Sequence, residues 1–196
     1  MRIIHVYRLA TLLGVLTALL IGSRADAQRV ALKTNLPYLA ATSPNLGLEL
    51  RVGRHSTIDL GGGMSLWKFD EATTLKHWLV QPEYRYWICE PMNGHFVGLH
   101  LHGGQYNIGG INIPIGRLKK LKEERYQGYF YGAGLSYGYQ WVLSSKLNLE
   151  ASLGGGYARI WYERYPCAAC GNKFGEGFYN YWGLTRATLS LVYFLN

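Results

Sequence analysis

The chain has 196 residues and a formal net charge of +8, with 25 Gly, 16 Tyr, 6 Trp and only 16% charged residues. This length suits a single domain. After residue 27 no run approaches the roughly 18 apolar residues of a membrane-spanning helix, which excludes a helical membrane protein for that part of the chain. If residues 28–196 enter a membrane, they must form a closed barrel, because every backbone N–H and C=O group in hydrocarbon has to be paired.

The first 27 residues have the pattern of a secretory signal peptide. Arg2 and Arg8 precede an apolar run over 9–22, which is too short to span a bilayer, and Ala25-Asp26-Ala27 fits a signal-peptidase site. We therefore predict a signal peptide at 1–27 and an outer-membrane β-barrel domain at 28–196. An uncleaved anchor helix is the alternative.

Removal of the signal peptide leaves 17 basic and 11 acidic residues. Such a basic excess can indicate nucleic acid as a partner, but a secretion signal argues against it. Phosphorylated lipid at a cell surface agrees better with both features.

From Val30 onward the hydrophobic pattern has a period of two, which is typical of strands. In 46–52, Leu46, Leu48 and Leu50 alternate with Gly47 and Glu49. The same alternation recurs along the chain and predicts eight strands, at 29–36, 46–52, 57–67, 78–88, 95–107, 126–141, from 147 onward, and at 186–195.

The predicted connections alternate in length. Short ones fall at 53–56, 89–94 and 143–146, and longer ones at 37–44, 68–76, 108–124 and 163–180. Short periplasmic turns and long external loops are typical of outer-membrane barrels. All six Trp residues also fall at or near predicted strand ends, as interfacial girdles would place them, although Trp67 and Trp87 have inward parity. The general preference of aromatic residues for strands is the alternative explanation.

The polar face of the predicted strands carries an interior ionic network of four acids and four bases. These are Lys33, Glu49, Arg51, Asp59, Glu83, Arg85, Glu150 and Arg186. Charges in a confined interior need partners, and eight strands leave an interior that side chains just fill. The pattern predicts a polar, filled lumen instead of a pore, and the opposite of the apolar cavity of a soluble ligand-binding barrel.

Several motifs are similar to those of a known family. They are 31–36 (ALKTNL), 44–49 (PNLGLE), 81–87 (QPEYRYW), 93–96 (NGHF) with Tyr106-Asn107, and 138–141 (GYQW). They resemble a family of small outer-membrane barrels of the Bacteroidota that is catalogued as a domain of unknown function. The resemblance covers nearly all of 28–196 and implies a barrel in the outer membrane. It implies no catalytic residues.

Three cysteines are present, two of them in a CxxC motif. Cys167 and Cys170 fall in a predicted loop, where an oxidising environment favours a local disulfide. A zinc site would need two more ligands and a redox centre would need a βαβ context, while a reducing habitat would leave a dithiol. Cys89 falls in a short turn at the other end and is predicted to be unpaired.

Two further groups could act on ligands. His100 and His102 share a strand face and could serve a lipid-modifying enzyme that combines His with Ser and an acid; structural histidines bonded to Glu or Tyr are the alternative. The predicted loop at 108–124 and its flank carry Arg117, Lys119, Lys120, Lys122 and Arg125, a candidate patch for anionic lipid. A solvated loop face explains the same residues.

Together these patterns predict an all-β protein: an eight-stranded, antiparallel, up-and-down transmembrane β-barrel with a polar, filled interior, preceded by a signal peptide. We expect a non-enzymatic structural, envelope-organising or surface-loop role in the bacterial outer membrane, without cofactor or metal. The expected partners are outer-membrane lipid, lipopolysaccharide and a surface or periplasmic protein, with no nucleic acid. A lipid A-modifying enzyme and a narrow channel are the alternatives.

Overall fold

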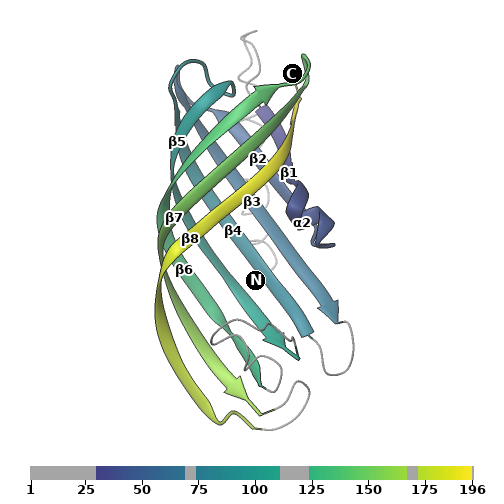
Figure 1. Ribbon diagram of the computed structural model, residues 1–196, viewed down its shortest axis with the longest axis vertical. Helices are drawn as coiled ribbons and strands as arrows, with labels where there is room; N and C mark the ends of the chain where they lie inside the picture. Colours follow the sequence, from purple (N-terminus) through teal and green to yellow (C-terminus); the bar gives the residue numbers. More distant parts are fainter. Residues whose placement is uncertain (1–29, 69–73, 111–123, 167–171, 196) are drawn as a thin grey trace, which may run out of the picture.

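A computed structural model describes residues 30–68, 74–110, 124–166 and 172–195. Eight strands form a closed barrel in which each strand pairs antiparallel with the next and β8 pairs with β1 (Figure 1). The elements are β1 Val30–Asn35, α2 Leu36–Ala40, β2 Asn45–Arg51, β3 Ser56–Lys68, β4 Thr74–Trp87, β5 Gly94–Gly109, β6 Arg125–Val142, β7 Leu147–Tyr165 and β8 Gly175–Phe194. The all-β, up-and-down barrel expected from the sequence is confirmed. The predicted signal peptide lies outside the described residues.

The two faces of the wall differ in polarity, as the period-two pattern predicts. Outward side chains are apolar and exposed, such as Leu135 and Tyr137 on β6 and Leu153 on β7. Their inward neighbours Ser136 and Ser152 are buried. The wall is thus apolar outside and polar inside, because successive side chains of a strand point to opposite faces of the sheet.

The barrel has a short-turn end and a long-loop end. The turns at 52–55, 88–93 and 143–146 lie at the short-turn end, together with the C-terminus (Figure 1). The opposite end carries the connections between β1 and β2, β3 and β4, β5 and β6, and β7 and β8. This alternation agrees with the loop lengths read from the sequence.

The wall is uneven in height at the long-loop end. Strands β1 and β2 have 6 and 7 residues, whereas β6, β7 and β8 have 18, 19 and 20. Helix α2 lies beside the low part of the wall (Figure 1), where the Tyr38 hydroxyl is 2.7 Å from His77 Nε2. Pro37 stands in its first turn, where a missing N–H is tolerated. The sequence pattern predicts only a loop at 37–44, so this helix was not expected.

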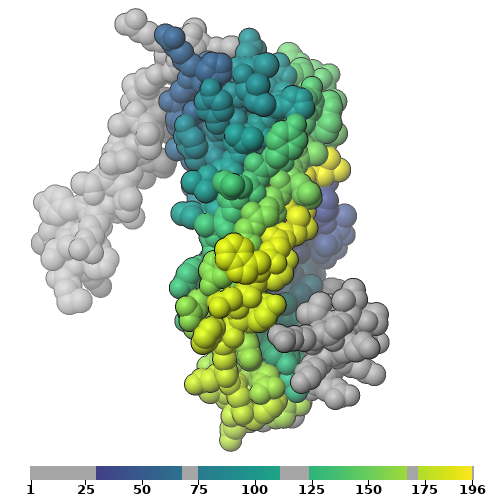
Figure 2. All heavy atoms as spheres, turned by 60° about the vertical axis from the view of Figure 1, so that its left-hand side comes forward, coloured from purple at the N-terminus to yellow at the C-terminus, as the bar shows by residue number. Residues whose placement is uncertain are grey.

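Strand β8 is much longer than predicted. It begins at Gly175 and pairs with β7 up to Arg164, so the connection predicted at 163–180 is shorter than expected. The pairing slips at Gly154/Gly155, where Arg186 and Leu184 face consecutive β7 residues. This β-bulge shifts the alternation of β8 by one residue. Outward side chains of β8 therefore have odd numbers after the bulge and even numbers before it, such as Leu184 and Trp182. Because of this change, the period-two pattern did not show that 175–194 is one strand. In Figure 2 the yellow band of β8 crosses the outer surface obliquely beside β7.

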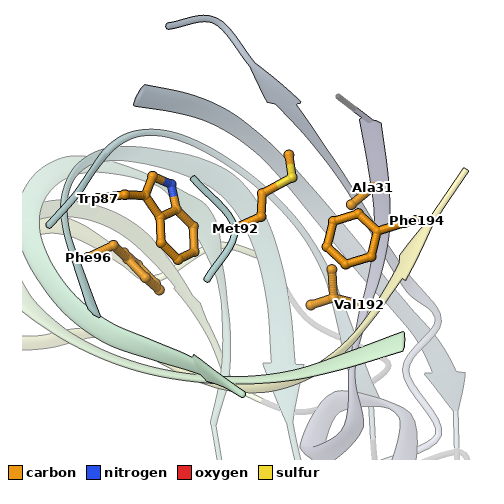
Figure 3. Packing of buried hydrophobic residues seen from close by; sticks show 6 residues of the cluster. All are labelled: Ala31, Trp87, Met92, Phe96, Val192 and Phe194. Atoms are coloured by element: carbon orange, nitrogen blue, oxygen red, sulfur yellow. The ribbon is translucent and has the colours of Figure 1, made fainter. Parts of the chain in front are cut away.

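An apolar layer closes the interior at the short-turn end. This basal apolar cluster consists of Ala31, Trp87, Met92, Phe96, Val192 and Phe194 (Figure 3). Met92 comes from the 88–93 turn, has a φ of 66° and is 2% exposed. Its carbonyl accepts a hydrogen bond from Asn148 Nδ2 at 3.2 Å, which ties the turn to β7. Trp87, whose inward parity fitted a girdle position poorly, is fully buried in this cluster.

Candidate functional site: the ionic plug and the vestibule

Arg85 is the centre of the barrel's buried charges. Its guanidinium contacts four carboxylates from four other positions in the wall: Nε lies 2.5 Å from Glu83 Oε2, and Nη2 lies 2.7 Å from Asp59 Oδ2. Nη1 lies 2.9 Å from Glu150 Oε2 and 3.2 Å from Glu49 Oε2. The planar, five-donor guanidinium can serve several carboxylates at once, which the point charge of a lysine cannot do equally well.

Two further cations complete the cluster. Lys33 Nζ bridges Glu49 and Glu150 and lies 2.5 Å from the latter. Arg186 Nη2 lies 3.0 Å from Asp59 Oδ2 and 3.4 Å from Glu83 Oε2. We call the seven residues Lys33, Glu49, Asp59, Glu83, Arg85, Glu150 and Arg186 the ionic plug; all are 7% exposed or less.

Neutral side chains bind the remaining edges of the plug. Thr57 Oγ1 donates to Glu49 at 2.5 Å, and the Ser136 hydroxyl donates to Glu83. Arg186 donates to Ser152 Oγ at 3.2 Å and to Gln81 Oε1 at 3.0 Å. With Ser136 from β6, and with His100 from β5, whose Nδ1 lies 4.0 Å from Glu83, every strand sends a side chain to this level. The side chains of the ionic plug therefore meet across the whole lumen.

One expected member is absent from the plug. Arg51 is exposed at the end of β2, where its Nε donates to the carbonyl of Gly53 at 3.1 Å. The prediction that Arg51 belongs to the interior network is wrong. Parity along the strand was correct, but the strand ends before this side chain reaches the enclosed volume. The ionic plug thus contains four acids and three bases instead of the balanced set that we expected.

His100 and His102 lie on the inward face of β5, next to the plug on its long-loop side. Their shared parity predicted that both would face the same way. They are 0% and 7% exposed, and their ring centroids are 5.7 Å apart. Glycines on the neighbouring strand β6 leave room for the two imidazole rings. A Cβ on Gly134, for example, would lie 2.7 Å from His100 Nε2. His100 Nε2 is 2.9 Å from the hydroxyl of Thr185, the residue that the bulge in β8 accommodates.

Between the histidines and the long-loop end, the lumen widens into a vestibule. It has a volume of about 1080 Å³ and is lined by residues of β3 to β8, including His77, Tyr106 and Tyr162. Phe130 lies between the histidines and the vestibule, with ring centroids 6.3 Å from His102 and 6.4 Å from Tyr106. The sequence signal for the vestibule is the presence of Tyr residues near the long-loop ends of β5 to β7, such as Tyr106, Tyr126 and Tyr162, and the vestibule was not predicted from them.

Other predicted site residues lie elsewhere or outside the described residues. Cys167 and Cys170 belong to the latter group, as do Arg117, Lys119, Lys120 and Lys122 of the basic patch. Arg125 begins β6, and its guanidinium carbon lies 4.3 Å from the centroid of the Tyr165 ring. Cys89 is exposed and has a free thiol. Within the described ranges no group of three or more His, Cys, Asp or Glu could hold a metal ion.

The comparison with protein families agrees with the motifs quoted above. The model described as "Protein of unknown function (DUF3575)" matches residues 12–195. The chain belongs to the DUF3575 family. No curated protein and no solved structure matches the chain. The described part of the chain contains no helix long and apolar enough to cross a membrane.

Proposed function

We propose that this protein is a non-enzymatic integral barrel of the bacterial outer membrane, with a structural or surface-interaction role. In this proposal the ionic plug keeps the lumen closed while the vestibule and loops face the cell exterior. The observation that carries the proposal is the apolar outer wall around a charged core. A soluble barrel would expose a polar wall to water, because large contiguous apolar surfaces are rare on soluble monomers.

The spacing of the outward aromatic residues supports membrane insertion. On β6, Trp141 and Tyr131 both point outward and are 44% and 53% exposed. The ten residue steps from Tyr131 to Trp141 span about 33 Å along a strand and about 25 Å along the axis of a barrel whose strands tilt by about 40°. An apolar band of about 25 Å between two aromatic girdles is typical of outer-membrane barrels. Trp78 on β4 and Tyr157 on β7 extend the girdle at the long-loop end.

The contents of the lumen argue for a closed barrel over a channel. Ion passage from the vestibule to the short-turn end would have to separate Arg85 from its carboxylates and then cross the basal apolar cluster. Breaking a buried ion pair by removing one partner costs about 3–5 kcal/mol. Such a barrier makes spontaneous opening rare.

Cell fractionation and conductance measurements together test this proposal. We expect the full-length protein in the outer-membrane fraction, with the slower gel migration on heating that marks a stable barrel. Purified protein in planar bilayers should give no steady conductance. Recovery as a soluble protein would refute the membrane location, and open-channel currents would refute the closed lumen.

A lipid-modifying enzyme remains the competing candidate, and one observation favours it. Thr185, His100 and Glu83 form a hydroxyl–imidazole–carboxylate series, with separations of 2.9 and 4.0 Å. Against catalysis, His100 is fully buried, and Glu83 already binds Arg85, Arg186 and Ser136. Incubation of the purified protein with lipopolysaccharide, followed by mass spectrometry of lipid A, decides between the two. A mass change that the His100→Gln variant abolishes would favour the enzyme.

A further inference from the structure

An apolar groove runs along the outer wall between β4 and β6. It has a volume of about 490 Å³, and its walls include the exposed side chains of Trp78, Val80, Leu101 and Tyr129. Its floor contains Gly103, a position with outward parity that carries no side chain. The groove exists because a bulky residue is missing at this point of an otherwise continuous apolar surface.

A local gap in the sheet deepens the groove. The β4–β5 pairing runs to Val80↔Gly103 and resumes only at Glu83↔His100. Pro82 lies in this interval and has no N–H to donate to the neighbouring strand. Pro82 and His102 both line the groove.

Arg159 lies on the same outer face, two strands away. Its guanidinium carbon lies 4.8 Å from the centroid of the Trp161 ring and 4.4 Å from that of Phe178. No carboxylate of the described residues forms an ion pair with it, and its buried Nε has no hydrogen-bond partner there. A cation stacked on aromatic rings keeps the edge of its guanidinium available for a bidentate anion.

The strand register places the groove and the cation side by side on the outer wall. Gly103 pairs with Tyr131, and Tyr131 pairs with Arg159. Two strand spacings separate Gly103 from Arg159, or about 10 Å. Both lie at the girdle of the long-loop end, where the hydrocarbon of the proposed outer leaflet meets its headgroups. Leu101 and Pro82 continue the groove toward the membrane centre.

From this arrangement we infer a binding site for one outer-leaflet lipid with a phosphorylated headgroup, of the lipid A type. An acyl chain occupies the Gly103 groove, and a headgroup phosphate binds the guanidinium edge of Arg159. The inference rests on the proposed outer-membrane location. Charge complementarity favours this occupant, because a guanidinium that forms no ion pair with the described residues lies at the headgroup level beside a groove of apolar side chains.

Two substitutions test the two halves of the site. Arg159→Gln removes the charge and leaves a shorter, neutral polar side chain. Gly103→Leu fills the groove, and the sheet accommodates it because a Cβ there lies 3.6 Å from its nearest neighbour, the Phe130 carbonyl. Lys173→Gln and Gly62→Leu are the matched controls. Lys173 is an exposed cation, and Gly62 is another outward glycine, where a Cβ likewise lies 3.6 Å from its nearest neighbour, the Leu79 carbonyl.

The assay is native mass spectrometry of detergent-purified, full-length protein titrated with diphosphorylated lipid A and, separately, with lipid A stripped of phosphate. The wild type should retain the phosphorylated lipid. Arg159→Gln should weaken its binding at least about 10-fold, as expected for loss of a charge-assisted hydrogen bond. The same substitution should leave binding of the phosphate-free lipid unchanged, and Gly103→Leu should weaken both. The two controls should bind as the wild type does.

Equal binding by Arg159→Gln and Lys173→Gln would overturn the inference, as would equal binding of the two lipids by the wild type. Heat-dependent gel migration of each variant establishes that its barrel is folded, and Arg159→Lys, which keeps charge without the planar fork, should bind at an intermediate level. Fractionation of the wild type distinguishes failure of the lipid site from failure of the proposed outer-membrane location. A barrel found in the outer membrane that fails the lipid test refutes only this site, whereas a soluble chain refutes the proposed function itself.

Discussion

Replacing Arg85 by Met is the most direct test of the ionic plug. The substitution keeps a long, flexible side chain but leaves Glu49, Asp59, Glu83 and Glu150 without their shared partner. The formal charge of the plug then falls from −1 to −2, because four acids would face two bases. Removing one member of a buried ion pair costs about 3–5 kcal/mol, and Arg85 serves four carboxylates, so we expect at least this loss of folding free energy.

Urea unfolding of the purified barrel, followed by heat-dependent gel migration and tryptophan fluorescence, measures this loss. With a slope of about 2 kcal/mol per molar urea, the unfolding midpoint should fall by about 2 M. Arg51→Met is the matched control, because Arg51 is exposed and outside the plug; surface substitutions of this kind usually change stability by less than about 0.5 kcal/mol. Equal midpoints for the two variants would refute the reasoning. Adding Glu83→Gln to Arg85→Met should recover part of the loss.

Three further predictions concern packing and orientation. Gly134→Ala should destabilise the barrel, because its Cβ would lie 2.7 Å from His100 Nε2 and 2.5 Å from a β7 carbonyl, whereas Gly62→Ala has room; thermal melts of both variants compare them. Trp87→Ala should lower the unfolding free energy by about 3–5 kcal/mol, as measured by urea titration, because it removes a large, fully buried ring from the basal apolar cluster. In a background without the other two cysteines, Cys89 should react with a membrane-impermeant maleimide only after the outer membrane is permeabilised, because the proposed orientation puts its turn in the periplasm; labelling on intact cells would contradict this orientation.

The number and direction of the strands could be predicted from the sequence because one simple rule governs them. Wherever a strand has water or lipid on one face and polar side chains on the other, alternation appears directly in the residue types. This rule identified the inward position of Glu49, Glu83, Arg85 and Glu150, all of which are buried. Their common meeting point follows from the narrow interior of an eight-stranded barrel.

The alternation pattern did not predict features that depend on where a strand ends or on where a bulge shifts the alternation by one residue. Arg51 has the parity of an inward residue but lies at the end of its strand, at the mouth of the barrel. Parity predicts which face a side chain is on, but not how deep in the barrel it lies. Thr185 interrupts the alternation of β8, so the predicted start of the strand at 186 is eleven residues later than the observed start at Gly175. Met92 enters the lumen from a turn, with a left-handed φ that no periodic pattern can indicate. Helix α2 is a single short turn, below the length at which helical periodicity is visible.

The plug has an excess of carboxylates, and His100 lies next to one of them. With Arg51 outside, four carboxylates face three cations, and Asp59 Oδ1 and Glu150 Oε1 have no hydrogen-bond partner within the described residues. His100 is the nearest titratable group on the vestibule side, with Nδ1 4.0 Å from Glu83. Substitutions at His100 and at Glu83 should therefore be coupled, because each residue changes the field at the other. A double-mutant cycle with His100→Gln and Glu83→Gln should give a coupling energy above about 0.5 kcal/mol in the urea assay. Strictly additive effects would mean that the plug ends at Glu83 and that the histidines only pack against it.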